Sequence, residues 1–282
     1  MTCVLIASLA LAPASFAARE GYSYFGVGTD YIAYSERNDN LLNTGITLAS
    51  GSDIAATTQR GGGYVGHESG WGFYIASEAT LGNNVNDESW TLNGTRVQED
   101  SFSFRRSELT VLVAYDFTQR QSVLFGGATH DTSFNRFDWH AVEQDEFIIS
   151  LPDGTVSEDV FKLYGLIGYE TGTLFLNEHD SRLNWQLRML AGIPLFSQTL
   201  NTESAVDTIT GGFDGYLLEV DALLGYRLTS HLLLGLSLKY SIEYQEEIQS
   251  DFINESQQRV KRTLPENELS LFQPTLNMYW SF

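Results

Sequence analysis

The 282-residue sequence predicts an all-β fold, a transmembrane antiparallel up-and-down β-barrel of about ten strands, with eight or twelve strands as the alternatives. The first observation behind this prediction is a period of two: from Gly21 onward, aromatic and β-branched residues alternate with polar or small ones. The second is length, since the clearest alternating segments run for about 13 to 15 residues, whereas strands of soluble proteins usually have about 5 or 6. The third is that short and long connections alternate along the chain, which is typical of barrels that cross a membrane.

The ten predicted strands follow from these patterns in chain order. They cover residues 21–35, 59–68, 71–81, 103–117, 122–133, 159–170, 182–198, 213–228, 232–246 and 267–282. The eighth and ninth are the clearest, because every second residue from Tyr216 to Leu228 and from Leu232 to Tyr244 is apolar. Such strands suit a bilayer span of about 9 to 11 tilted residues with an extension into water.

The connections predict an orientation. Short ones fall at residues 69–70, 118–121, 171–181 and 229–231, and long ones at 36–58, 82–102, 134–158, 199–212 and 247–266. Short turns are expected in the periplasm and long loops outside the cell, so an even number of strands places both termini in the periplasm. Turn signals around 43–58 and 147–156 predict an extra hairpin in two of the long loops, and counting these segments differently gives the alternative strand numbers.

The first residues predict an export signal. Residues 1–17 carry no charge, contain the apolar run from Val4 to Ala12 and end in the tripeptide Ser15-Phe16-Ala17, although no Lys or Arg precedes the run. We therefore divide the chain into a signal peptide at 1–17 and an outer-membrane barrel at 18–282. Cys3 is the sole cysteine and lies in the signal, so the exported barrel is expected to have no disulfide or thiolate site.

The charge balance excludes one class of partner. The chain has 36 Asp and Glu against 16 Lys and Arg, for a net charge of −20. A phosphate backbone would repel such a chain, so nucleic-acid binding is excluded. The five long connections carry most of the negative charge, which predicts an acidic extracellular surface.

Ionisable residues on the inward faces are the candidate lumen residues. They are Asp30, Glu78, Glu108, Lys162, Arg188, Glu219, Asp221, Arg227, Lys239 and Glu243, accompanied by Tyr24, Tyr74, Tyr164 and Tyr279. Side chains can fill the narrow interior of such a barrel, and unpaired charges there would be costly, so we expect an ion-pair network that closes the lumen. The alternative is a solute path lined by these charges. No segment has the spacing of zinc ligands, a calcium loop or a phosphate-binding loop, so no cofactor and no metal site are expected.

The end of the chain carries a family resemblance. Pro274, Leu276, Met278, Trp280 and the terminal Phe282 share one face of the last strand. This pattern resembles the C-terminal signature of Gram-negative outer-membrane β-barrel proteins, which the barrel-assembly machinery recognises. The resemblance implies residence in the outer membrane, with outer-membrane lipid and lipopolysaccharide as neighbours and the assembly machinery as a partner during biogenesis.

The mature length and long hairpins also resemble the omptin family of ten-stranded outer-membrane proteases. That family uses an Asp–His pair and an Asp–Asp pair near the barrel top, and this resemblance implies His130, Asp131, Asp138 and His140 as candidates. The chain departs from the family's motif in two places. In the fourth long connection, where the family has Asp-x-His, Asp207 is followed by Thr208 and Ile209. Near the second, where the family has Asp-x-Asp, the chain has Asp87-Glu88. The predicted function is therefore a non-enzymatic structural or binding protein with a largely plugged lumen, and the alternatives are a narrow channel or an omptin-like peptidase.

Overall fold

A computed structural model describes residues 21–41, 44–82, 84–142, 154–176, 181–201, 208–210, 212–253 and 259–282. The expected signal peptide at 1–17 lies outside these residues. The described strands are β1 (Tyr22–Leu41), β2 (Ile46–Gly66), β3 (Trp71–Leu81), β4 (Asn84–Leu92), β5 (Thr95–Thr118), β6 (Gln121–Ala141), β7 (Val156–Gly172), β8 (Leu183–Asn201), β9 (Thr208–Thr210), β10 (Gly215–Arg227), β11 (Leu232–Gln245), β12 (Ile248–Ile253), β13 (Arg259–Leu264) and β14 (Glu266–Ser281).

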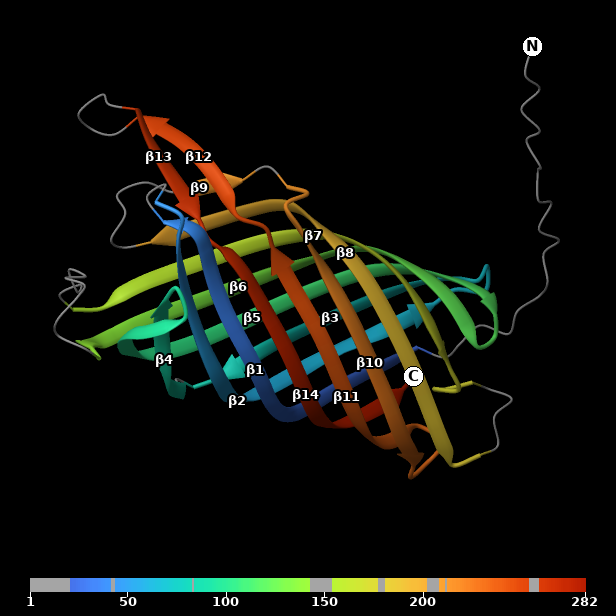
Figure 1. The fold of residues 1–282 in the computed structure, drawn as a ribbon. Helices are drawn as coiled ribbons and strands as arrows, with labels where there is room; N and C mark the ends of the chain where they lie inside the picture. The colour runs from blue at the N-terminus through green and yellow to red at the C-terminus, as the bar shows by residue number, and fades with distance from the viewer. Residues whose placement is uncertain are drawn as a thin grey trace, which may run out of the picture.

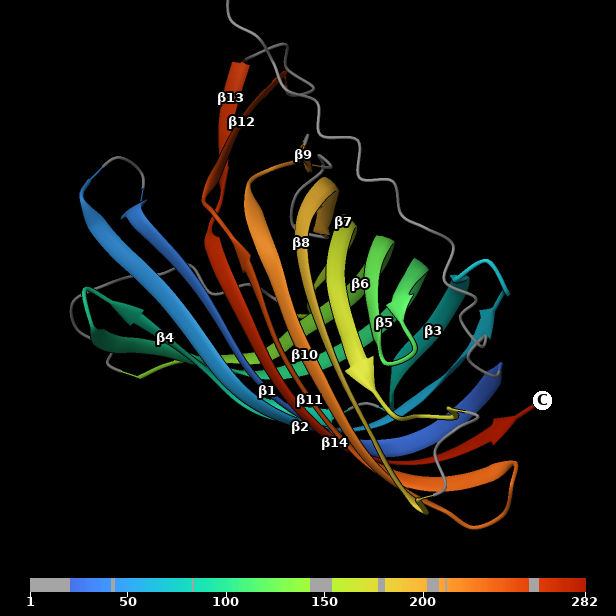
Figure 2. The ribbon, with the colours of Figure 1, turned by 90° about the vertical axis from the view of Figure 1, so that its right-hand side faces the viewer.

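Ten of these strands close into a ring. Their order is β1-β14-β11-β10-β8-β7-β6-β5-β3-β2, and β2 pairs again with β1 (Figures 1 and 2). Neighbouring strands are antiparallel, including the closing pair of β1 with β2 and the pair of β1 with β14. The prediction of an antiparallel up-and-down barrel is confirmed, and closure leaves no edge strand in the ring.

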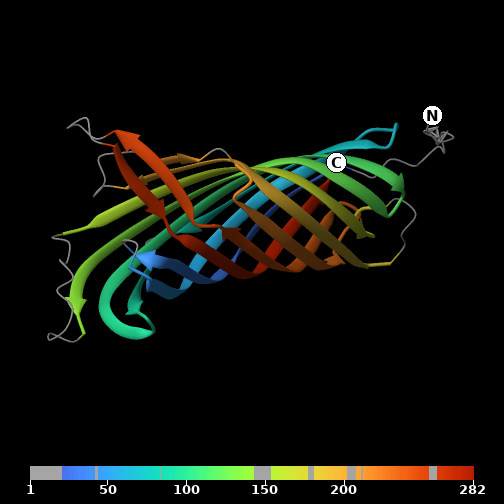
Figure 3. The same cartoon turned by 45° about the horizontal axis from the view of Figure 1, so that its top comes forward.

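The two ends of the barrel differ. Compact connections follow β2, β5 and β10 at one end, where β1 also begins and β14 finishes; we call it the short-turn end. At the opposite, long-loop end, the strands extend and the β12–β13 hairpin projects, far from the C-terminus (Figure 1). Figure 3 shows the strands inclined to the barrel axis, as closure of a sheet requires.

The hairpins of the long loops differ from the prediction. The segment 43–58 contains no hairpin of its own, because β2 is continuous from Ile46 and Gly51 pairs with Ser35 of β1. Residues 143–153 lie outside the described part, so the hairpin expected at 147–156 is untested beyond the start of β7 at Val156. Extra hairpins occur instead at β4–β5 and β12–β13, in the second and fifth long connections.

Alternation along each strand separates two surfaces. In β10, Leu217, Glu219 and Asp221 are buried inside the ring, whereas the intervening Leu218 and Val220 are exposed on the outer wall. No helix in the described part of the chain is long and apolar enough to cross a membrane.

Candidate functional site

An aromatic layer fills the lumen at the short-turn end. The Tyr22 ring stacks on Tyr64 and Phe175, with centroids 5.8 and 5.6 Å apart, and lies 5.9 Å from Tyr279. Phe175 and the adjacent Leu174 belong to the β7–β8 connection and are both 1% exposed. This connection therefore does more than join two strands, because its apolar residues fold into the barrel mouth.

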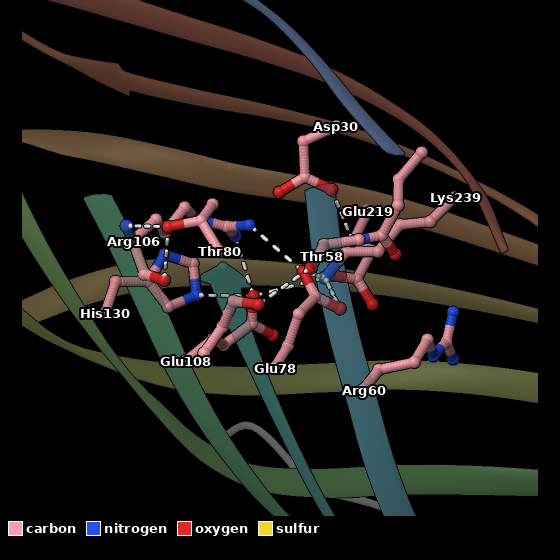
Figure 4. A network of polar contacts seen from close by, with 12 residues as sticks. Asp30, Thr58, Arg60, Glu78, Thr80, Arg106, Glu108, His130, Glu219 and Lys239 are labelled. Carbon is pink, nitrogen blue, oxygen red and sulfur yellow. Dashed lines mark hydrogen bonds and ion pairs between the residues drawn. The ribbon is translucent and has the colours of Figure 1, made fainter. Parts of the chain in front are cut away.

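An ion-pair layer lies above it and is centred on Lys239 (Figure 4). The Lys239 ammonium lies 3.2 Å from Glu78, 3.1 Å from Glu108 and 3.0 Å from Glu219. Arg106 completes the group, 3.1 Å from Glu78 and 2.6 Å from Glu108. Because β3 and β11 are not neighbours in the ring, the Glu78–Lys239 pair joins the walls across the lumen.

Further pairs extend this layer. Arg60 on β2 lies 2.6 Å from Asp221 on β10, again across the lumen. Glu243 accepts a hydrogen bond from Lys162 at 2.7 Å and lies 2.8 Å from His130 Nδ1. These buried charges are paired, as the cost of burying single charges requires.

The structure places all ten sequence-predicted lumen residues on the inner face of the ring. Besides those already described, Asp30 accepts a hydrogen bond from Gln273 at 2.8 Å. Arg188 pairs with Glu170 at 2.6 Å and lies 3.8 Å above the Tyr74 ring. Arg227 donates to Asn184 at 3.3 Å.

Sequence reasoning missed several members of the network. Arg60, Arg106 and Glu170 were absent from the predicted set although each pairs with a predicted residue. Strand alternation could have identified Arg106, because it lies two residues from Glu108 and therefore on the same face. Arg105 beside it faces outward, so the alternation along the strand determines which of the two adjacent arginines points into the lumen.

The spaces left in the lumen are small. The cavity beside Lys239, Asp221 and Tyr24 has a volume of about 20 Å³. Another, beside Tyr34, Lys162 and Glu243, has about 30 Å³. Each has room for about one water molecule.

A second aromatic layer covers the ion pairs toward the long-loop end. Tyr34 lies 4.7 Å from Phe134 and 6.0 Å from Phe102, measured between ring centroids. Ile32, Ile54 and Leu271 are buried in the same cluster. The lumen thus has a polar layer between two apolar ones.

A cleft opens above this layer at the long-loop end. Its volume is about 290 Å³, and its lining includes Glu36, Trp90, Arg136, Trp139 and Glu158. Asn201 donates a hydrogen bond to Glu158 at 3.0 Å, and the Trp139 indole donates to the Gly154 carbonyl at 3.2 Å. Two indoles and carboxylates therefore line this cleft.

Arg136 is held at the base of the cleft by two carboxylates. Its guanidinium lies 2.6 Å from both Glu36 and Glu88, and 5.5 Å above the Trp90 ring. Asp100 faces Glu88 directly across the β4–β5 pair and is 2% exposed. Burial, followed by the charge of Glu88, raises the pKa of Asp100 to about 7.

The four candidate catalytic residues are not brought together. His130 lies in the lumen with Glu243, whereas Asp131 faces outward because adjacent strand residues point to opposite faces. Asp138 has a left-handed backbone with φ 55° and an exposed side chain. His140 is exposed at the end of β6, 3.0 Å from Glu99; the Asp138 carbonyl and then the Glu99 carboxylate raise the pKa of His140. Within the described ranges, no group of three or more His, Cys, Asp or Glu is arranged to hold a metal ion.

The C-terminal residues form part of the outer wall. Pro274, Leu276, Met278, Trp280 and Phe282 alternate with the buried Thr275, Asn277, Tyr279 and Ser281. Pro274 has no backbone N–H, and the paired register between β14 and β1 is interrupted between Thr275 and Phe272.

Comparison with solved structures identifies the fold. The crystal structure of the outer membrane protease OmpT from Escherichia coli matches with a TM-score of 0.70 over 95% of this chain and 99% of that chain. The chain has the fold of an outer-membrane β-barrel. At 12% sequence identity, the likeness to OmpT shows the fold alone.

Other barrels are more distant. The translocator domain of the autotransporter NalP from Neisseria meningitidis has a TM-score of 0.35 and 11% identity, covering 93% of this chain and 88% of that chain. The outer membrane protein OprG from Pseudomonas aeruginosa has the same TM-score and identity, covering 94% and 97%. Neither a protein-family model nor a curated protein matches the sequence.

Proposed function

We propose that this chain is an integral outer-membrane protein of a Gram-negative bacterium that does not conduct and that binds a ligand at its extracellular mouth. The observation that carries the proposal is the filled lumen, in which ion pairs join opposite walls between two aromatic layers. The outer wall supports membrane residence, because Leu218, Leu224 and Leu236 are 48, 56 and 52% exposed there.

The proposed orientation puts the short-turn end and both termini in the periplasm. Short periplasmic turns and long outer loops are the rule for bacterial barrels. Outer-membrane lipid and lipopolysaccharide would surround the wall, and the outward residues from Pro274 to Phe282 would serve the barrel-assembly machinery as a recognition signal.

The cleft favours a cationic ligand. Glu36 and Glu88 are two carboxylates against the single charge of Arg136, and Glu158 adds a third. Arg37 also lines the cleft but is paired with Asp39, so the mouth keeps an excess of negative charge. Arg136 already lies over the Trp90 ring, and the indole of Trp139 offers a further cation–π contact to an ammonium or guanidinium group. An acidic, aromatic surface is suited to a basic peptide rather than to an anion.

Conductance of the refolded protein in a planar bilayer tests the closed lumen. We expect no open-channel steps for the wild type, with insertion verified by flotation of the protein with lipid vesicles. Clear steps from inserted protein would overturn the proposal in favour of a channel, and changes on Lys239→Ala or Glu219→Ala would then locate the path.

Titration with hexalysine tests the binding site. Tryptophan fluorescence should change on binding, and Glu158→Gln should weaken the apparent affinity by about tenfold if it removes one charge-assisted contact. Arg37→Gln serves as a control, since Arg37 lines the cleft but carries the opposite charge. A response that is the same for wild type and Glu158→Gln would remove the cleft from the proposal.

An omptin-like peptidase is the second candidate, favoured by the fold likeness to OmpT and by the His140–Glu99 pair. A peptidase of this kind would cleave a basic peptide, and His140→Ala would abolish cleavage. Absence of cleavage by inserted wild-type protein would set this candidate aside without affecting the binding proposal.

A further inference from the structure

The outer wall of the barrel is not equally apolar around its circumference. On β10 and β11 the outward residues include Leu218, Val220, Leu236 and Leu238. On β2 and β3 the outward residues Val65, Phe73 and Ile75 are apolar near the short-turn end, as is Leu81 farther along. Between them, in the middle of the two strands, the outward positions hold polar or small residues, which we call the β2–β3 outer face. They are Thr57, Gln59, Gly61, Ser77 and Ala79.

Strand register places this face within the apolar band. Gln59 lies opposite Val27 of β1 and Ala79 of β3. Farther toward the long-loop end, Tyr31 and Leu81 still point outward, 52 and 40% exposed. Gln59 is thus flanked by apolar residues above and below, and in the proposed outer-membrane location its side chain faces hydrocarbon.

Hydrocarbon is a poor environment for the Gln59 amide. The amide has two donors and one acceptor, and it forms no hydrogen bond with any residue in the described part of the chain. Lipid tails offer no hydrogen bonds, so such a group is stabilised by a protein surface that does.

Gly61 supplies an independent observation. A Cβ at Gly61 would meet only ordinary contacts, 3.4 Å from the Tyr24 carbonyl and 3.9 Å from the Phe25 ring. Gly63 differs, because its Cβ would lie 2.6 Å from the Tyr22 carbonyl. The barrel itself therefore requires glycine at position 63 but not at position 61, where the missing side chain leaves a flat surface in the middle of the face.

We propose that the β2–β3 outer face is the contact surface of a dimer of this chain within the membrane. A second copy fits because an amide is both donor and acceptor, so two Gln59 side chains related by a two-fold axis satisfy each other. All copies insert in one orientation, which makes a two-fold axis along the membrane normal possible. None of the five residues of this face is charged, and the intervening Arg60 points into the lumen toward Asp221, so two copies meet there without repulsion.

Disulfide cross-linking in the membrane tests the contact. In a Cys3→Ser background the introduced thiol is the sole one in the chain, and mild oxidation of Thr57→Cys should give a covalent dimer. Leu236→Cys, on β11, is the matched control and should remain monomeric. Equal cross-linking at both positions, no dimer at position 57, or a cross-link from position 57 to a different protein would each overturn the proposal.

Sedimentation of the uncross-linked protein in detergent supplies the second measurement. Gln59→Leu removes the amide, and Gly61→Leu fills the flat surface; each should raise the dimer dissociation constant by about tenfold. Leu236→Ala should leave it unchanged. Leucine is typical of a lipid-facing wall, so both leucine variants are expected to insert, and flotation with vesicles checks this. Loss of flotation would count against the membrane location, whereas loss of the dimer with flotation intact concerns the contact alone. Unchanged dissociation constants in both inserted variants would refute the contact.

Discussion

Lys239 is the residue on which the lumen network depends most. It faces three carboxylates, from Glu78, Glu108 and Glu219, at 3.2 Å or less. Lys239→Met would leave Glu78 and Glu108 paired with Arg106 but would remove the ion pair of Glu219. Breaking a buried ion pair usually costs about 3–5 kcal/mol. We expect a loss of this size in the free energy of unfolding, measured by urea titration of the vesicle-inserted protein.

An exposed ion pair provides the comparison. Arg37 and Asp39 are 2.7 Å apart with more than half of each side chain exposed, so solvent screens the pair and Arg37→Ala should be far less destabilising than Lys239→Met. If Lys239→Met is no more destabilising than Arg37→Ala, the network does not hold the walls together.

Asp100 makes the β4–β5 hairpin sensitive to pH. Its carboxyl has an ordinary pKa of 3.8 but a pKa of about 7 in the fold, because it is buried beside Glu88. Between these values the folded hairpin binds a proton that the unfolded chain has released, so its stability falls as pH rises from about 4 to 7. Hydrogen exchange of β4 amides, corrected for intrinsic rates, should show decreasing protection over this interval.

The matching variant is Asp100→Asn, which removes the titrating group while keeping its size. Protection of β4 should then be nearly independent of pH and higher than in the wild type at pH 8. A variant that retains the full pH dependence would assign the effect to another group, with Glu88 the next to substitute.

The site residues illustrate how far sequence reasoning reaches. Strand parity placed Glu219, Lys239 and Glu243 inside the barrel, because long regular strands leave only two faces to choose from. It could not pair them, since the Glu78–Lys239 contact depends on which strands face each other across a closed ring. The predicted strand at 122–133 ends just after His130, which would put this residue near the barrel top. The observed β6 continues to Ala141, so His130 lies deeper in the lumen.

At the scale of elements, the β4–β5 hairpin depends on its turn. Asn93 and Gly94 have φ values of 48° and 83°, the left-handed pair that a two-residue hairpin turn requires. Gly94→Val should destabilise the hairpin by about 1–2 kcal/mol, since a β-branched residue is strained at that φ. Faster hydrogen exchange in residues 84–104 would be the result.

A glycine without this constraint serves as the control. Gly51 on β2 does not have a positive φ, and a Cβ there would meet only the Tyr34 carbonyl at 3.7 Å. Gly51→Ala should therefore leave exchange in the hairpin unchanged. Equal effects at both positions would point to general loosening of the long-loop end.

The same two glycines explain why the hairpin predicted at 43–58 is absent and another occurs at β4–β5. Ser50-Gly51-Ser52 has the composition of a turn, but these residues pair in register with β1, and neighbouring strands override local preference. Asn93-Gly94, by contrast, is a strong hairpin signal in the sequence, and it forms the turn that the structure shows. The long strands β10 and β11 were predictable because periodicity, length and a short turn all agreed.

At the scale of the whole molecule, charge and apolar surface are separated into distinct zones. Opposite charges meet inside the ring, apolar side chains cover much of its outside, and acidic residues such as Asp53, Asp87 and Glu99 lie at the long-loop end of the described strands. Because the lumen charges are paired, the excess of acidic over basic residues in the described part of the chain lies largely outside this network.

Closure of the ring predicts how the protein migrates in detergent gels. Each barrel strand is hydrogen-bonded on both sides, so there is no edge at which detergent could begin to unravel the sheet, and unfolding requires heat. In detergent gels, the unboiled refolded protein should therefore remain compact and migrate faster than the boiled protein. Identical migration of the two samples would contradict a closed barrel. The Phe175→Ala variant should keep the difference in migration, because closure rests on strand pairing rather than on the aromatic layer at the short-turn end.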